Sequence, residues 1–231
     1  MQSKRILGVI ILLVMIAGFL LVSVKWEESY LWLSFAMVGL SLLMFLIRFE
    51  KRKVEPRELV LIAVLAAIAA VGRIPFASIP SVQPTTFIIM MSGFVFGSES
   101  GFLIGAVAAL ASNMILGQGP WTPWQMVAWG LVGMTAGLLR KTPVMNNKYG
   151  RIFFGIVWGF LFGLIMNVWG LLSFIQSGVP LDYKTFITYF GASVLFDSMH
   201  AVSNVFFLLV FSGTWLKILM RFKSKYGLLE R

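Results

Sequence analysis

Long apolar runs separated by short polar segments make up most of the chain. An apolar run of about 20 residues crosses a hydrocarbon core of about 30 Å as an α-helix. Lipid offers no hydrogen-bond partners to the backbone, so helices are the elements that such runs predict. We expect eight membrane-spanning segments, some of them short, at residues 6–24, 30–47, 59–71, 85–96, 101–116, 124–139, 152–175 and 186–211.

The first apolar run follows Lys4 and Arg5, as the apolar part of a secretory signal peptide does. The run is longer than in a typical signal, and a charged segment rather than a small-residue cleavage pattern follows it. We therefore expect a retained span. A two-span hairpin, residues 1–50, would then precede a six-span core, residues 51–231.

The charged residues predict the orientation of these spans. When eight spans are threaded with the N-terminus inside, the outer segments hold only Lys25, Arg73 and Lys184. The remaining 16 of the 19 Lys and Arg residues fall on the inner segments. Cytoplasmic segments of membrane proteins collect basic residues, so both ends of the chain are expected inside.

Composition supports a membrane protein and limits its chemistry. The chain is 59% hydrophobic and 12% charged, whereas soluble domains are about 45–50% apolar and about 25% charged. The net charge of +10 lies in the segments between spans, which favours membrane lipid as its partner over nucleic acid. The absence of cysteine excludes disulfides, thiolate metal sites and cysteine nucleophiles. We expect an all-α integral membrane protein.

Small residues recur at helical spacing in the first core span. Ala63 and Ala67 are four residues apart, and so are Ala66 and Ala70. Small residues at this spacing let another helix approach closely. The approaching helix belongs either to the same bundle or to a partner protein, and the spacing alone leaves both open.

Two outer segments are rich in residues that break helices. Residues 73–84 contain Pro75, Pro80 and Pro84, which prevent a continuous helix. This segment is either a gate over a site or a stiff connector. Residues 117–125 contain tryptophans and polar side chains, which form either an interfacial aromatic belt or the wall of a small-molecule site. The residues concerned are Gln118, Trp121, Thr122, Trp124 and Gln125.

Further polar residues occur within the core spans. Asn113 and Asn167 fall in the outer half of their helices, and Asp197, His200 and Asn204 share one helix face. Asp197 and His200 either bond to each other and stabilise the bundle, or line a polar site in which Asp197 orients His200. No nucleophile-elbow serine or metal-ligand spacing accompanies them.

Residues 56–222 resemble an S component, the six-span vitamin-binding membrane subunit of an energy-coupling factor (ECF) transporter. The alanine pattern, the Val-Gln-Pro-Thr-Thr sequence at 82–86 and the Gly105-x-x-x-Ala109-x-x-x-Asn113 span carry the resemblance. The Gly-Gln-Gly-Pro-Trp-Thr-Pro-Trp-Gln-Met sequence at 117–126, with Ala-Trp-Gly-x-x-Gly at 128–133, is most similar to S components assigned to cobalamin.

The resemblance implies a function and partners. An S component captures a vitamin at the outer face of a prokaryotic plasma membrane and docks on a transmembrane T component joined to two ATPase subunits. It is thought to topple and release the vitamin inside. Ala63, Ala66, Ala67 and Ala70 would form the docking face. The chain would be no enzyme and would need no metal or cofactor, and it has no Walker-type ATP-binding sequence.

The predicted substrate site combines hydrogen-bonding side chains with aromatic faces. Its basic residue, Arg73, would meet either a carboxylate or phosphate of the ligand or a lipid headgroup. The predicted site residues are Arg73, Gln83, Thr85, Asn113, Gln118, Trp121, Trp124, Gln125, Trp129, Asn167, Asp197 and His200.

Other functions remain open at this stage. The substrate is expected to be cobalamin or a related corrinoid, with folate, riboflavin, pantothenate or a nucleobase-like precursor as alternatives. A different class is an intramembrane enzyme that uses Asp197 and His200. A third is a membrane scaffold or sensor whose polar residues serve packing alone.

Overall fold

The computed structural model describes residues 56–178 and 182–226, together with five isolated positions in the first 40 residues. The predicted N-terminal hairpin therefore lies almost entirely outside the described residues. Within residues 56–178 and 182–226 the chain forms seven α-helices, one 3₁₀ helix and no strand. These elements are α3 (Pro56–Val71), η2 (Ile74–Phe76), α4 (Thr85–Phe96), α5 (Ser98–Leu116), α6 (Thr122–Leu138), α7 (Pro143–Asn146), α8 (Lys148–Gln176) and α9 (Tyr183–Tyr226).

The all-α prediction is confirmed for this part of the chain, and each predicted core span falls almost entirely within a single helix. Among the described residues, four segments are long and apolar enough to cross a membrane, namely Pro56–Phe76, Ser98–Leu116, Lys148–Ile175 and Tyr183–Tyr226. Helix α4 is a shorter apolar helix. The total of eight spans and their orientation stay predictions.

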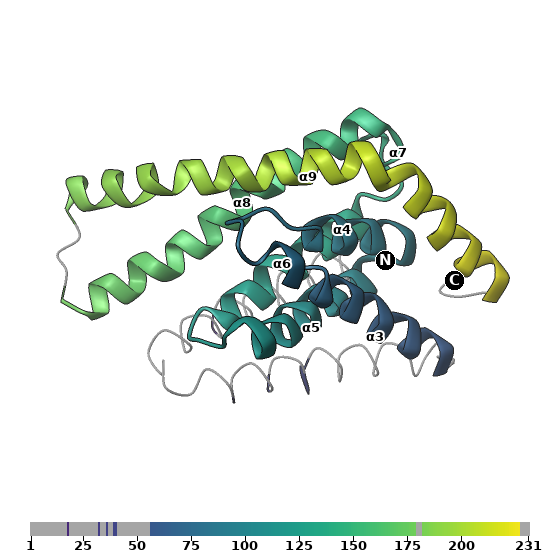
Figure 1. The fold of residues 1–231 in the computed structure, drawn as a ribbon, viewed down its shortest axis with the longest axis horizontal. Coiled ribbons are helices and arrows are strands. Elements are labelled where there is room, and N and C mark those ends of the chain that lie inside the picture. Colours follow the sequence, from purple (N-terminus) through teal and green to yellow (C-terminus); the bar gives the residue numbers. More distant parts are fainter. Residues whose placement is uncertain are drawn as a thin grey trace, which may run out of the picture.

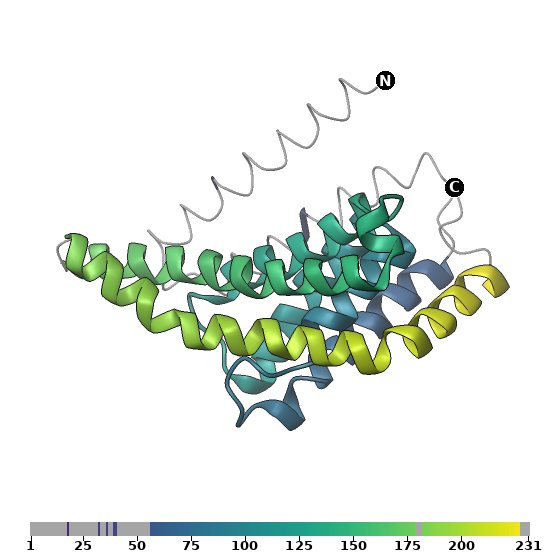
Figure 2. The ribbon, with the colours of Figure 1, turned by 90° about the horizontal axis from the view of Figure 1, so that it is seen from above.

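Helices α4, α5 and α6 form the centre of the bundle. Helix α3 packs on α4 and α5, α9 packs on α4, and α8 packs on both α6 and α9 (Figure 1). Helices α8 and α9 run beside each other for most of their length (Figure 2).

The three central helices approach so closely that their backbones touch. A Cβ atom added to Gly133 of α6 would collide with the backbone of Gly101 in α5, and one added to Gly93 of α4 would collide with Gly133. Since only glycine permits this contact, Gly93, Gly101 and Gly133 let the three helices pack backbone to backbone.

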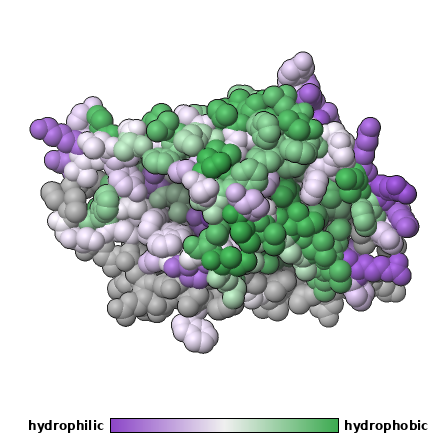
Figure 3. Space-filling view, viewed as in Figure 1, coloured by the Kyte–Doolittle hydropathy of each residue, from purple (hydrophilic) through white to green (hydrophobic). Residues whose placement is uncertain are grey.

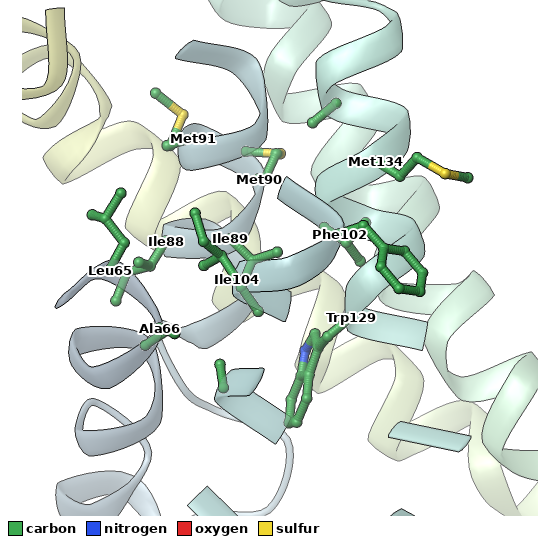
Figure 4. Close-up of a cluster of buried hydrophobic side chains, with 14 of the residues drawn as sticks. Leu65, Ala66, Ile88, Ile89, Met90, Met91, Phe102, Ile104, Trp129 and Met134 are labelled. Atoms are coloured by element: carbon green, nitrogen blue, oxygen red, sulfur yellow. The ribbon is translucent and has the colours of Figure 1, made fainter. Parts of the chain in front are cut away.

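Apolar side chains from α3, α4, α5 and α6 fill the space between these helices (Figure 4). Ile89, Met91 and Ile104 have no exposed surface, and neither does Trp129. Outside, hydrophobic residues dominate the middle of the face in Figure 3, while hydrophilic residues gather toward its two ends. This distribution suits a protein surrounded by hydrocarbon in its middle and by water at its ends.

Helix α9 is much longer than the predicted span at 186–211. Its 44 residues extend roughly 66 Å at 1.5 Å per residue, which exceeds the thickness of a hydrocarbon core. Asp182 precedes its first turn and accepts a hydrogen bond from the backbone N–H of Thr185 at 2.7 Å. This bond lowers the pKa of the Asp182 carboxyl.

Close packing of α8 on α9 depends on small residues of α8. A Cβ atom added to Gly159 would collide with the backbone of Ala201, and one added to Gly163 would collide with the carboxylate of Asp197. Gly155, one turn earlier, faces the Leu208 side chain in the same way. The three glycines therefore form a flat strip along which α9 lies.

The connections at one end of the bundle are ordered as their prolines predict. Helix α3 ends at Val71, and a series of turns follows, in which Ser81 has a left-handed φ of 60°. Helix α6 begins at Thr122 with Pro123 in its first turn, where a missing N–H costs nothing.

Candidate functional site

Arg73 lies just after the end of α3 and directs its guanidinium toward neighbouring polar side chains. Its Nε donates to Oε1 of Gln83 at 3.0 Å. Its Nη1 donates to Oγ of Ser112 at 2.5 Å and to Oδ1 of Asn113 at 2.8 Å. The side chain therefore joins the segment before α4 to the last turns of α5.

Asn113 extends this set of bonds to α6. Its Nδ2 donates to Oγ1 of Thr122 at 3.0 Å and to Oε1 of Gln125 at 2.7 Å. Asn113 is only 2% exposed, so its amide connects three parts of the chain inside the bundle. We refer to Arg73, Gln83, Ser112, Asn113, Thr122 and Gln125 as the Arg73 network.

Trp129 links the Arg73 network to His200. The guanidinium carbon of Arg73 lies 4.8 Å from the centre of the Trp129 ring, a cation–π contact. The indole Nε1 of Trp129 donates to Oγ1 of Thr86 at 3.0 Å, and this hydroxyl lies 2.7 Å from Nε2 of His200. Since the Thr86 hydroxyl accepts a hydrogen bond from Trp129, its own O–H is free to donate a hydrogen bond to His200.

Asp197 belongs to a second group of polar residues between α8 and α9. Its Oδ2 accepts a hydrogen bond from Oγ of Ser193 at 3.1 Å, and Ser193 also accepts from Nδ2 of Asn167 at 2.6 Å. We refer to Asn167, Ser193 and Asp197 as the Asp197 group. Of the two alternatives for Asp197 and His200, the structure does not show the direct bond between them, because Nε2 of His200 lies against Oγ1 of Thr86 instead.

Gln83 holds the connection between α3 and α4 against α9. Its backbone N–H donates to Oγ of Ser203 at 3.0 Å, and the same hydroxyl donates to the carbonyl oxygen of Gln83 at 3.3 Å. Together with the bond from Arg73, these contacts fix both the backbone and the side chain of Gln83.

Three other predicted site residues make contacts within the bundle. Oγ1 of Thr85 donates to the carbonyl oxygen of Ala69 at 3.0 Å, which ties α4 to α3. Nε2 of Gln118 donates to the carbonyl oxygen of Leu110 at 3.2 Å, while its buried Oε1 has no partner among the described residues. Trp124 is 4% exposed.

Two tryptophans meet beside the start of α6. The rings of Trp121 and Trp169 lie 6.0 Å apart in an edge-to-face arrangement. The Trp121 ring also covers Gly119, where a side chain would collide with it. The buried Nε1 of Trp169 has no hydrogen-bond partner in the described part of the chain. This donor and the Gln118 acceptor are groups that a ligand can satisfy.

Sequence reasoning missed several hydroxyl groups that complete the two polar sets. These residues are Thr86, Ser112, Ser193 and Ser203. Thr86 and Ser112 each adjoin a predicted site residue. The spacing of Ser193 one turn before Asp197 is a signal that was present in the sequence.

The four predicted docking alanines face in two directions. Ala66 and Ala70 are 1% and 3% exposed, because they pack inside the bundle. Ala63 and Ala67 are exposed, and the exposed side chains of Val60, Val64, Ile68 and Val71 surround them. Only Ala63 and Ala67 therefore offer a small-residue surface to a partner.

No group of three or more His, Asp or Glu side chains is arranged to hold a metal ion within the described residues. The site instead consists of amides, hydroxyls, tryptophans and one guanidinium at the end of a bundle of apolar helices. These features define a multi-span membrane protein with a buried polar site.

A family model described as "ECF transporter, substrate-specific component" matches residues 57–213. The chain belongs to this family. Its members are transport subunits and not enzymes, so the prediction that the chain is no enzyme is confirmed.

The chain is also similar to a UPF0397 protein of Vibrio atlanticus (strain LGP32). The two are 29% identical over 97 residues, which cover 40% of this chain and 51% of the relative. The chain thus spans about half the length of that curated relative. No solved structure matches the chain.

Proposed function

We propose that the chain binds a vitamin at the Arg73 network and passes it inward with a T component and two ATPase subunits. The observation that carries the proposal is the network itself. Polar and charged groups between apolar helices are costly, and in membrane proteins they mark substrate pathways. Here they gather at one end of the bundle, beside two ordered connections and Trp129.

Cobalamin or a related corrinoid is the proposed substrate. Its support is the similarity of residues 117–126 and 128–133 to S components assigned to cobalamin. Trp121 and Trp169 offer large apolar faces, and Gln118 and Trp169 each keep a buried hydrogen-bonding atom without a partner among the described residues. A large ligand rich in amides suits a surface that combines aromatic rings with unpaired hydrogen-bonding atoms.

The connection between α3 and α4 is the proposed lid of this site. Gln83 is its anchor, since it bonds to Arg73 through its side chain and to Ser203 through its backbone. Exposed Ala63 and Ala67 on α3 form the proposed docking surface for the T component, because small residues let a partner helix approach closely. A prokaryotic plasma membrane is the proposed location.

Mass spectrometry of the purified full chain tests the proposal. The protein is expressed in rich medium with added cobalamin and isolated in mild detergent together with any partner proteins. We expect a bound corrinoid and copurified ATPase subunits. Another bound vitamin would replace cobalamin as the substrate. A protein with neither ligand nor partner, whose melting temperature no vitamin raises, would contradict the proposed function.

A further inference from the structure

The Arg73 network contains one positive charge and no acidic side chain among the described residues. Glu58 precedes Arg73 by 15 residues along the chain, which is roughly 20 Å at 1.5 Å per helical residue. Glu99 lies in the first turn of α5, whereas Ser112 and Asn113 lie near its end. Asp182 bonds to Thr185.

Asp197 is the fourth acidic residue in the described part of the chain. It accepts a hydrogen bond from Ser193 within the Asp197 group. Within the described part of the chain, the Arg73 guanidinium therefore donates hydrogen bonds to neutral acceptors alone. Moving a cation out of water is costly even after relaxation, and neutral partners offset only part of that cost. The site is thus complementary to a negative charge.

The hydrogen bonds also fix which way the amides of the network point. Arginine is a donor only, so the atoms of Gln83 and Asn113 that face Arg73 must be oxygens. The Nδ2 of Asn113 then faces Gln125, and the Gln125 atom that accepts its hydrogen bond must be Oε1. The oxygen atoms of all three amides are therefore used within the network.

Three N–H donor groups of the network remain without a hydrogen-bond acceptor among the described residues once the amides are oriented in this way. Nη2 of Arg73 and Nε2 of both Gln83 and Gln125 make no hydrogen bond to any residue in the described part of the chain. All three side chains are half-buried, so a ligand can reach them. Within the described residues, the network as a whole offers free N–H groups and a positive charge, while each of its amide oxygens already accepts one hydrogen bond.

We propose that the transported molecule carries an anionic group, and that this carboxylate or phosphate binds Arg73 with the side-chain amides of Gln83 and Gln125. This inference rests on the proposed function and specifies the chemical class of its substrate. Arg73 supplies the charge, and the two glutamines supply neutral donors on either side of it. The ring of Trp129 supports the guanidinium from one face.

Matched probes test the charge requirement. The full chain in phosphatidylcholine nanodiscs is titrated with pairs that differ in one anionic group: pantothenate and pantothenol, nicotinate and nicotinamide, and riboflavin 5′-phosphate and riboflavin. Cobalamin is compared separately with cobinamide, which lacks the whole nucleotide loop, phosphate included. We expect an anionic member to bind at least about tenfold more tightly than its neutral partner, as a charge-assisted hydrogen bond implies. Equal affinity within every pair that binds, or no binding of any anion, would overturn the inference.

Variants of the network assign the preference to Arg73. Arg73→Met should lose the difference between the members of a pair, and Arg73→Lys should keep part of it because the charge remains. Arg140→Met removes a positive charge near the end of α6 and should leave the preference unchanged. If Arg73→Met keeps the wild-type preference for the anion, Arg73 does not bind it.

A variant that is expected to stay folded gives an independent test. Gln83→Glu places a carboxylate against Nε of Arg73 in a nearly unchanged shape. This internal anion should raise the melting temperature and weaken binding of the external anion by about tenfold or more. Wild-type affinity in a folded Gln83→Glu protein would contradict the inference.

A lipid headgroup offers the same phosphate chemistry as a soluble anion. Adding phosphatidylglycerol to the nanodiscs distinguishes the two sources. If this lipid stabilises the wild type but not Arg73→Met, and no soluble anion does so, the site binds lipid and the inference fails. Uptake of a vitamin without any carboxylate or phosphate, together with the ATPase subunits, would also overturn the inference but would leave the proposed function intact.

Discussion

Asn113 is the residue on which the Arg73 network depends most. It accepts from Arg73 and donates to Thr122 and Gln125, so one amide joins three segments. Asn113→Ala should lower the free energy of unfolding by about 1–3 kcal/mol, the usual effect of leaving buried polar groups without partners. Thermal unfolding in detergent measures the change. Ser177→Ala, at an exposed position after α8, is the control and should have almost no effect.

Thr86 performs a similar function between Trp129 and His200. Thr86→Val removes the acceptor of the Trp129 N–H and the partner of the imidazole while it keeps the shape of the side chain. We expect a loss of about 1–3 kcal/mol in unfolding free energy. Thr86→Ser should restore most of it. Equal stability of Thr86→Val and the wild type would show that these bonds contribute little.

The sequence identified many of the polar residues of the site but not their partners. Arg73, Gln83, Asn113 and Gln125 stood out because polar groups are rare beside apolar runs, and the structure brings them into one network. The prediction placed Asp197 with His200 because they share a helix face. In the structure, His200 instead contacts Thr86 of α4, and Asp197 bonds to Ser193. Residue spacing along one helix does not reveal which neighbouring helix each side chain contacts.

At the scale of the helices, the glycine strip of α8 sets its distance from α9. Gly159→Ala would drive a methyl group into the backbone of Ala201. Forced separation of packed helices costs about 1–3 kcal/mol, so the melting temperature should fall. Gly191→Ala is the matched control, because open space surrounds that glycine. The control should be neutral or slightly stabilising, since alanine favours helix. Equal effects of the two variants would refute the packing argument.

The lengths of the helices show where the hydrophobic pattern predicts well. Helix α4 has the predicted bounds because Gly97 and the proline-rich segment interrupt the chain at both ends. Helix α9 continues past the predicted end at 211, through Lys217 and Arg221. Hydropathy marks only the part of a helix that suits lipid, and a charged helix in water gives no such signal.

For the whole molecule, the predicted orientation can be measured directly. The chain has no cysteine, so single cysteines report accessibility without background. Ser81→Cys, between α3 and α4, should react with an impermeant maleimide in intact cells. Tyr149→Cys, an exposed position at the start of α8, should react only after permeabilisation. The opposite pattern would place the polar site on the inner side and contradict capture from outside.

The docking surface can be separated from the substrate site because the exposed alanines lie within α3, whereas the residues of the Arg73 network lie outside that helix. Ala63 and Ala67 are exposed, whereas Ala66 and Ala70 pack inside the bundle. The double variant Ala63→Leu/Ala67→Leu should fold and bind ligand as the wild type does, since the added atoms point away from the core. It should lose copurification of the ATPase subunits and uptake, because a larger side chain keeps the partner helix away.

Ala192→Leu is the control for this experiment, since it enlarges an exposed alanine on α9. It should retain both ligand binding and uptake. Ala66→Leu should instead lower the melting temperature, because the added atoms enter a packed interior. If the double variant on α3 transports as well as the wild type, the T component docks elsewhere on the bundle, and the proposed role of the exposed alanines is wrong.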